Sequence, residues 1–163
     1  MTEEKKCPLY KKCGGCQLQN LSYAEQLKFK QRKVEKLLGE FAHVEPIIGM
    51  DEPYHYRNKV QAAFATARNG KIISGVYQSG THSIVCVDSC LTEDRKADEI
   101  IVSIRNMLKS FRIQPYDERS GGGTLRHVLV KRGFKTNQIM VVLVTSGPIF
   151  PAKNNFVKAL RKE

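Results

Sequence analysis

Apolar residues recur at helical spacing in three separate stretches of the chain. In the first stretch they fall on one face, which Lys30 interrupts: Tyr23, Leu27, Val34, Leu37, Leu38 and Phe41. The segment Ser22-Tyr23-Ala24-Glu25 has the pattern of a capping box, so we expect a helix from Ser22 to about Leu38. Second and third helices are predicted after Thr92, as the N-cap residue, and from Pro151 onwards.

Alternation of apolar and polar positions predicts strands in the middle of the chain. In residues 56–66, Val60, Ala62 and Phe64 point to one face, and Arg57, Lys59 and Gln61 to the other. Residues 71–78 and 82–87 extend this strand into an antiparallel meander. Two more strands are expected over 125–132 and 138–145, and the second, apolar on both faces, should be a covered central strand. A short edge strand containing Pro46 is predicted over 43–50.

These elements together predict the α+β fold class. We expect an antiparallel sheet of five or six strands with helices packed on it, and a cysteine-rich loop at one end. The 163 residues are divided into a cysteine-rich loop (1–21), a separate helix (22–40), a central α+β domain (41–150) and the start of a third helix (151–163). The helical pattern has not ended at Glu163, so we expect the chain to be part of a longer protein.

The charge balance favours a polyanionic partner. Lys and Arg number 27 against 16 Asp and Glu, which gives a net charge of +11. A surplus of this size on a small domain is typical of nucleic-acid binding, and a basic surface without a ligand is the alternative. No apolar run is long enough to span a membrane, and the N-terminus has no secretory signal, so we expect a cytoplasmic protein.

Three cysteines lie within ten residues, in the spacing C-x5-C-x2-C: Cys7, Cys13 and Cys16. In a reducing compartment such clustering indicates a metal rather than disulfides. One further ligand is expected from Cys86 or Cys90, and a three-plus-one layout favours an iron–sulfur cluster, with zinc or no metal as alternatives. Cys90 is preferred because it lies in a turn, whereas Cys86 lies in an apolar strand and is interpreted as a buried small side chain.

Two glycines, Gly14 and Gly15, separate the second and third cysteines. We expect them to adopt positive φ, which glycine reaches without strain, where the backbone folds around an ion.

The stretch Tyr54-His55-Tyr56-Arg57-Asn58-Lys59-Val60-Gln61 has the composition of a nucleic-acid contact. Aromatic and guanidinium planes stack on unpaired bases, lysine neutralises phosphate, and amides read base edges. Arg126-His127 is a second such stretch. The alternative for the first stretch is an edge strand whose charges prevent aggregation.

Four segments carry a resemblance to a known family: C-P-L-Y-K-K-C-G-G-C-Q-L-Q, Y-R-N-K-V-Q, V-D-S-C-L and L-R-H-V-L-V. The chain resembles the S-adenosylmethionine-dependent RNA uracil-5-methyltransferases, in particular the iron–sulfur branch that acts on 23S ribosomal RNA. The resemblance implies that a [4Fe–4S] cluster is bound by Cys7, Cys13, Cys16 and Cys90. It also implies RNA contacts at five residues: Arg57, Lys59, Gln61, Arg126 and His127.

In that family the methyltransferase domain lies C-terminal to this region, and its cofactor-binding loops and catalytic cysteine and base have no match here. The resemblance therefore implies the central, RNA-recognising part of a larger enzyme, with no catalytic or cofactor-binding residue of its own. We expect its partners to be RNA and the methyltransferase domain of the same protein, which would cover the helix in 22–40, and we expect a monomer. The rivals are a non-enzymatic zinc-binding RNA-binding module and an iron–sulfur redox or radical enzyme domain. The radical form needs a C-x3-C-x2-C motif, which this spacing contradicts.

Overall fold

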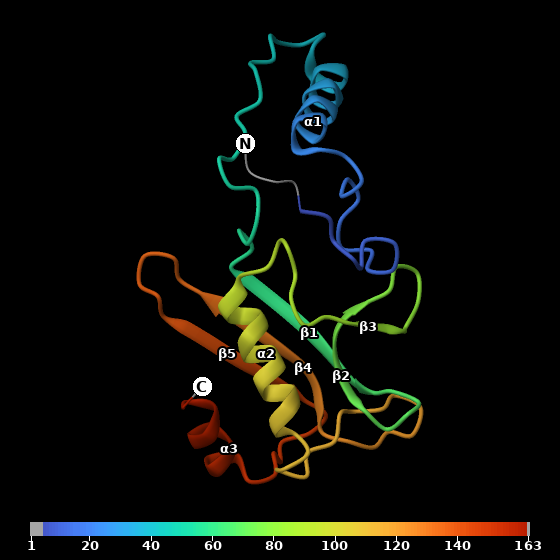
Figure 1. Ribbon diagram of the computed structural model, residues 1–163, viewed down its shortest axis with the longest axis vertical. Coiled ribbons are helices and arrows are strands. Elements are labelled where there is room, and N and C mark those ends of the chain that lie inside the picture. The colour runs from blue at the N-terminus through green and yellow to red at the C-terminus, as the bar shows by residue number, and fades with distance from the viewer. Residues whose placement is uncertain (1–4, 163) are drawn as a thin grey trace.

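The computed structural model describes residues 5–162 and contains a five-stranded antiparallel sheet (Figure 1). Its strand order is β3-β2-β1-β4-β5, with bounds β1 (Lys59–Thr66), β2 (Ile72–Tyr77), β3 (Ile84–Cys86), β4 (Leu125–Arg132) and β5 (Ile139–Thr145). The described helices are α1 (Tyr23–Leu38), α2 (Arg95–Met107) and α3 (Lys153–Leu160). The predicted α+β class and the antiparallel meander of β1, β2 and β3 are confirmed.

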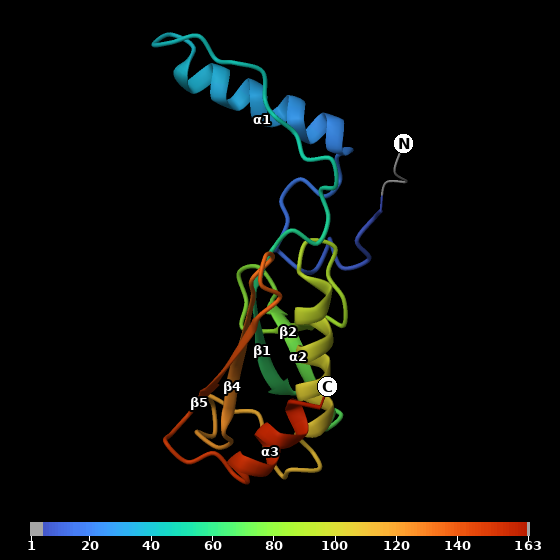
Figure 2. The ribbon, with the colours of Figure 1, turned by 90° about the vertical axis from the view of Figure 1, so that its left-hand side faces the viewer.

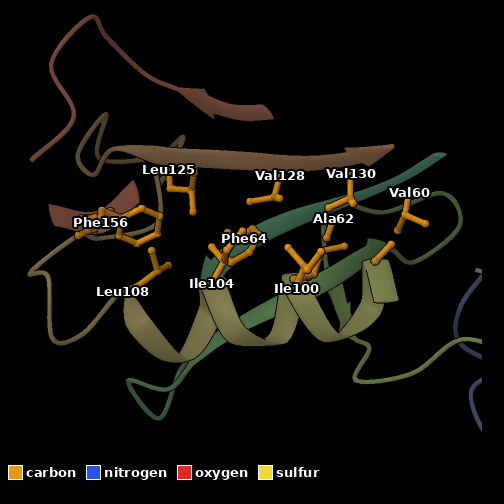
Figure 3. Close-up of a cluster of buried hydrophobic side chains, with 13 residues drawn as sticks. Val60, Ala62, Phe64, Ile100, Ile104, Leu108, Leu125, Val128, Val130 and Phe156 are labelled. Atoms are coloured by element: carbon orange, nitrogen blue, oxygen red, sulfur yellow. The ribbon is translucent and has the colours of Figure 1, made fainter. Parts of the chain in front are cut away.

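Helix α2 covers one face of the sheet and encloses the core with it (Figures 2 and 3). The predicted inward positions of β1 are buried beneath it: Val60, Ala62 and Phe64. From α2, Ile104 is fully buried among them, and Phe156 of α3 closes one end of the core. Burying one such side chain contributes about 1.5–3 kcal/mol to folding.

Helix α1 lies away from the sheet (Figures 1 and 2), and none of its residues is buried. It begins at the predicted capping box. The Ser22 hydroxyl accepts from the Glu25 N–H, and the Glu25 carboxylate accepts from the Ser22 N–H at 2.8 Å. Val34 and Leu38, on the predicted apolar face, are 41% and 53% exposed.

The strand predicted over residues 43–50 is wrong. This segment runs back beside α1, and its backbone bonds to side chains of the helix rather than to another strand. The Gln31 amide accepts from the Ile47 N–H at 2.8 Å, and the Tyr23 hydroxyl accepts from the Met50 N–H at 2.7 Å. These side chains supply the partners that a neighbouring strand would otherwise provide.

The prediction that residues 138–145 form a covered central strand is also wrong, because β5 is an edge strand paired only with β4. Val141 and Leu143 face the core, whereas Met140 and Val142, on the other face, are 49% and 39% exposed. We call this other face of the sheet, away from α2, the open face. An antiparallel sheet needs only one covered face.

Two predicted helix ends differ from the structure. Helix α2 is capped by Asp94 rather than Thr92, since the Asp94 carboxylate accepts from the Ala97 N–H at 3.1 Å. Helix α3 ends at Leu160, where an N–H of Lys162 bonds to the Ala159 carbonyl in a tighter turn. Glu163 lies outside the described residues. Over the described part of the chain, no helix has the length and apolar character needed to cross a bilayer.

Candidate nucleic-acid interface and cysteine loop

The cysteine loop, residues 7–16, lies against the turn that joins β2 and β3 (Figure 1). A Cβ atom on Gly14 would lie 2.6 Å from the Ser79 Cβ, so the contact requires glycine at this position. The expected positive φ at Gly14 and Gly15 is wrong, because neither has the left-handed backbone found at Gly70. Gly14 is needed for a close approach that anchors the loop to the sheet.

The structure brings Cys90 to the cysteine loop. Burial is the main cause that raises the pKa of the Cys16 thiol, and the next causes are the neighbouring thiols of Cys90 and Cys13. Cys7 adds to the effect, and the Arg57 guanidinium opposes it. The thiols of Cys7, Cys13 and Cys90 therefore lie close enough to Cys16 to influence its ionisation.

Cys86 does not take part in this group. Its sulfur accepts a hydrogen bond from Arg105 Nη1 at 3.3 Å, beneath the sheet edge. Cys86 is half-buried, as Cys90 is, so the expected burial of its side chain is not observed. The Arg105 guanidinium also pairs with Asp88.

The thiols of the cysteine loop, together with that of Cys90, suit a soft metal centre. Cys7, Cys13, Cys16 and Cys90 are free thiols and half-buried. Thiolates are the ligands of iron–sulfur clusters and of structural zinc. Within residues 5–162, no three Cys, His, Asp or Glu side chains are already close enough to enclose a metal ion. The residue types and their common location fit such a group, and binding it would require the thiols to move closer together.

The first turn of α2 holds Cys90 in place. The Asp98 carboxylate accepts from the Cys90 N–H at 2.8 Å, and the Cys90 sulfur lies 3.4 Å from the Thr92 hydroxyl. Asp98 is only 6% exposed, so this anchor is part of the packed structure. The position of the fourth thiol thus depends on α2 and not on the cysteine loop.

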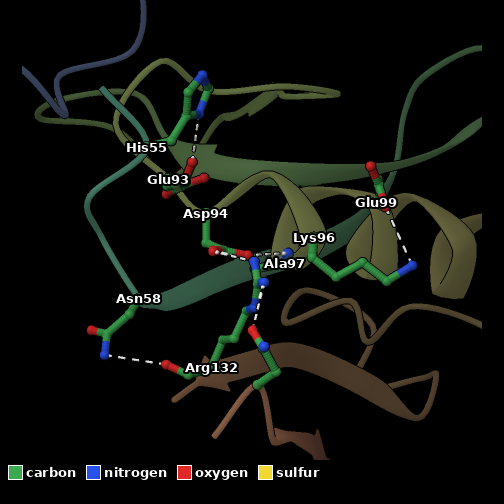
Figure 4. Close-up of polar contacts among 9 residues, drawn as sticks. His55, Asn58, Glu93, Asp94, Lys96, Ala97, Glu99 and Arg132 are labelled. Carbon is green, nitrogen blue, oxygen red and sulfur yellow. Dashed lines mark hydrogen bonds and ion pairs between the residues drawn. The ribbon is translucent and has the colours of Figure 1, made fainter. Parts of the chain in front are cut away.

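Glu93, on the segment that leads into α2 (Figure 4), forms a buried carboxyl pair with Asp98. Burial, followed by the charge of Asp98 and a hydrogen bond to it, raises the pKa of Glu93 to about 7. Arg57 Nη1, at 3.9 Å from the Glu93 carboxylate, opposes this increase. The backbone carbonyl of Glu93 also contacts His55 Nδ1 at 2.9 Å, which ties the segment before β1 to α2.

Three of the five predicted RNA-contact residues lie on the open face. Lys59 and Gln61 are exposed on β1, and the strand register places His127 of β4 opposite Ala63. Lys131 lies opposite Lys59, which puts two ammonium groups at the same end of the sheet. Burial, then Arg126, lowers the pKa of His127 and so favours the neutral form of its imidazole.

The other two predicted contacts lie elsewhere. Arg57 precedes β1 and faces the cysteine loop, as its influence on Cys16 indicates. Arg126 is held over the Tyr116 ring, 4.6 Å from its centroid, and bonds to the Glu118 carboxylate at 3.0 Å. The five residues therefore do not form one patch.

Tyr77 is a candidate contact that the sequence analysis did not single out. It lies at the end of β2, is 45% exposed, and its ring meets the His127 ring edge-on with centroids 6.3 Å apart. Its place in the 71–78 strand was predictable, but its proximity to His127 depends on the pairing of three strands.

Fold and site together define a basic α+β domain with an uncovered sheet face and a thiol-rich loop, a combination suited to nucleic-acid binding. No family model matches the chain. The chain is 45% identical over 165 residues to an uncharacterised RNA methyltransferase of Clostridium acetobutylicum, with 96% of this chain and 35% of the relative covered. An uncharacterised RNA methyltransferase of Clostridium tetani is 42% identical, with 98% and 35% covered.

A solved structure has the same fold over nearly all of the chain. It is the Pyrococcus abyssi tRNA (uracil-54, C5)-methyltransferase in complex with S-adenosyl-L-homocysteine, with a TM-score of 0.72 and 28% identity. The match covers 92% of this chain and 35% of that protein. The chain thus spans about a third of the length of these proteins, and it is related in sequence and fold to one part of RNA methyltransferases.

Proposed function

We propose that the chain is the RNA-recognising, cluster-bearing part of a methyltransferase that transfers a methyl group from S-adenosylmethionine to C5 of uracil in RNA. The observation that carries this proposal is the match in fold and sequence to a uracil-C5 methyltransferase over 92% of the chain. The similarity to proteins named RNA methyltransferases gives independent support. The proposal concerns the intact protein, in which a methyltransferase domain would supply the catalytic residues and bind S-adenosylmethionine.

RNA recognition on the open face is supported by the chemistry gathered there. The ammonium groups of Lys59 and Lys131 can neutralise phosphates, and the Gln61 amide can pair with a base edge. Tyr77 and His127 offer aromatic rings to unpaired bases. Arg57 and Arg126, the other two candidates, would contact RNA beyond the limits of this face.

Cys7, Cys13, Cys16 and Cys90 would hold a [4Fe–4S] cluster. Such a cluster supplies thiolate–iron bonds that tie distant parts of a chain together, and no redox step is needed for this role. Here it would fix the loop that carries the first three thiols to the turn before α2. Zinc bound by the same four thiols would serve the same structural purpose, and the two are distinguished by the broad absorption of iron–sulfur near 400 nm.

The exposed apolar side of α1 supports packing against another domain of the same protein. Val34, Leu37 and Leu38 are 41–62% exposed within this chain. Burying such side chains is favourable by about 25 cal/mol per Å² of apolar surface. We infer that the methyltransferase domain covers this side in a monomeric enzyme.

The proposed substrate is 23S ribosomal RNA. Transfer RNA is a second candidate, because the solved structure with the same fold belongs to an enzyme named for uracil-54 of tRNA. Either substrate would present a uracil in an unpaired loop.

The test is release of tritium from RNA labelled at uracil C5, since methylation at that carbon displaces its hydrogen. The intact protein should release tritium from 23S rRNA in the presence of S-adenosylmethionine, and the 163-residue chain alone should release none while still binding that RNA. Tritium release from tRNA but not from 23S rRNA would identify tRNA as the substrate. No release from either RNA by the intact protein would contradict the proposal.

A further inference from the structure

A cavity of about 320 Å³ opens between the cysteine loop, the start of α1 and the segment that precedes β1. Its size lies within the range of small-molecule sites, roughly 300–1,000 Å³. It is separate from the open face, although Arg57, which lines the cavity, is only two residues from Lys59. The proposed function does not explain why this space exists.

The charged side chains that line the cavity, among the described residues, are all basic. Among the described residues its cationic lining comes from three places in the chain: Lys5 and Lys6 before the cysteine loop, Lys30 on α1 and Arg57 before β1. None of the described lining residues is Asp or Glu. Several cations converging on one concave space favour an anionic ligand.

The rest of the lining suits a nucleobase. The amides Gln17, Gln19 and Asn20 offer both donors and acceptors, and Tyr54 and Tyr56 offer rings. Tyr54 is already engaged, because its hydroxyl accepts from the Lys5 N–H at 3.0 Å and its ring lies under Lys5 Nζ. Tyr56 is 45% exposed, so its ring can receive a base.

We propose that this cavity binds one unpaired nucleotide of the RNA, with the phosphate held by Lys6, Lys30 and Arg57 and the base stacked on Tyr56. The inference rests on the proposed RNA-binding function and adds a second contact region to the open face. A free phosphate would use the cations but neither the amides nor the tyrosine ring. This assignment explains why a lysine, Lys30, interrupts the apolar side of α1: its ammonium group would bind the phosphate.

The absence of tryptophan from the sequence allows a specific optical test. In a Tyr56→Trp variant of the chain, purified without oxygen, the new indole is the sole tryptophan and reports on the cavity. Binding of a fluorescein-labelled heptauridylate, followed by anisotropy, establishes that RNA is bound. We expect unlabelled heptauridylate to quench the tryptophan emission at least twofold, and an abasic strand of equal length, also at saturation, to leave it unchanged.

A matched pair of charge variants tests the cationic part. Lys30→Gln removes a lining cation, and Lys36→Gln removes one that is also on α1 but does not line the cavity. Six residues along a helix span about 9 Å, more than the Debye length of about 8 Å at physiological salt. Lys30→Gln should weaken heptauridylate binding about threefold to tenfold, and Lys36→Gln by less than twofold.

The outcomes separate this inference from the proposed function. If heptauridylate binds but base-containing and abasic strands quench equally, and both lysine variants bind alike, the nucleotide cavity is overturned while RNA binding stands. If no RNA binds to the chain in the anisotropy measurement, both are overturned.

Discussion

Tyr77 and His127 meet across β1 on the open face, with ring centroids 6.3 Å apart and planes at 63°. Ala63, opposite His127 on the strand between them, is only 4% exposed, consistent with the two rings lying over it. Edge-to-face aromatic pairs contribute about 0.5–1.5 kcal/mol. The pair holds each ring in a fixed orientation, as a platform for an unpaired base requires.

Replacing Tyr77 with Ala should weaken the binding of single-stranded RNA. Loss of a stacking ring costs about 1–3 kcal/mol per base, and partial exposure of this ring places the expected loss near the lower limit, about fivefold to tenfold in Kd. Fluorescence anisotropy at constant salt measures it. Tyr77→Phe keeps the ring and should bind like the unchanged chain; equal affinities for the Ala and Phe variants would remove Tyr77 from the interface.

Gly14→Ala should loosen the cysteine loop and reduce the iron retained after anaerobic purification. The added Cβ would lie 2.6 Å from the Ser79 Cβ, so the loop or the β2–β3 turn must move. We expect less than half the iron per chain of the unchanged protein. Gly147→Ala is the control, because nothing lies within 4 Å of its added Cβ. Full iron content in both variants would show that the loop does not need this contact.

Cys90→Ser should lose the cluster, whereas Cys86→Ser should keep it. Cys90 influences the Cys16 thiol directly, and Cys86 is instead bonded to Arg105. Iron analysis and absorbance near 400 nm provide the comparison. Loss of iron from the Cys86 variant alone would reverse the ligand assignment.

The buried Glu93 should make the folded state less stable as pH rises. Its folded pKa of about 7 lies above the ordinary value of 4.5, so the folded state binds this proton more tightly than the unfolded state. The stabilisation is complete below pH 4.5 and is lost as pH rises through 7. Asp98 and Arg57 are the charged neighbours, and the Asp98 pKa is itself raised, chiefly by burial.

Urea unfolding at several pH values measures this effect. The free energy of unfolding should fall by about 1–3 kcal/mol between pH 5 and pH 8, from about 1.4 kcal/mol per pKa unit. Glu93→Gln should flatten the profile over that window. Glu99→Gln, which changes a surface carboxylate of α2 paired with Lys96, should leave it unchanged. A profile that stays equally steep in Glu93→Gln would assign the proton to another group.

Local signals in the sequence predicted the parts of the fold that depend on near neighbours. The capping box of Ser22 and Glu25 is a contact over three residues, and the inward positions of β1 follow from strict alternation. The apolar run Ile139–Val144 is compatible with a central strand and with an edge strand. Its position at the edge is determined by which strands pair with it. Hydrophobic periodicity also gives no signal for the side-chain hydrogen bonds that hold segment 43–50 against α1.

In the candidate site, too, the local motifs were predictable, and the contacts between distant segments were not. The spacing of Cys7, Cys13 and Cys16 is a local motif, and the turn before α2 favoured Cys90 as the fourth thiol. The pairing of Tyr77 with His127 is set by the register of β2, β1 and β4, which no single strand encodes. Arg126 lies at an irregularity in the pairing of β4 with β5, between Leu125 and His127, for which the local sequence gives no signal.

The central claim, that this chain itself recognises RNA, is tested most directly by the salt dependence of its binding to a single-stranded uridine oligomer. Each phosphate neutralised contributes about −0.7 to the slope of log K against log salt. With Lys59, Lys131 and Arg57 engaged, we expect a slope of about −2, reduced by about 0.7 in Lys59→Gln. Undetectable binding at 50 mM salt, or a slope that Lys59→Gln leaves unchanged, would contradict the account.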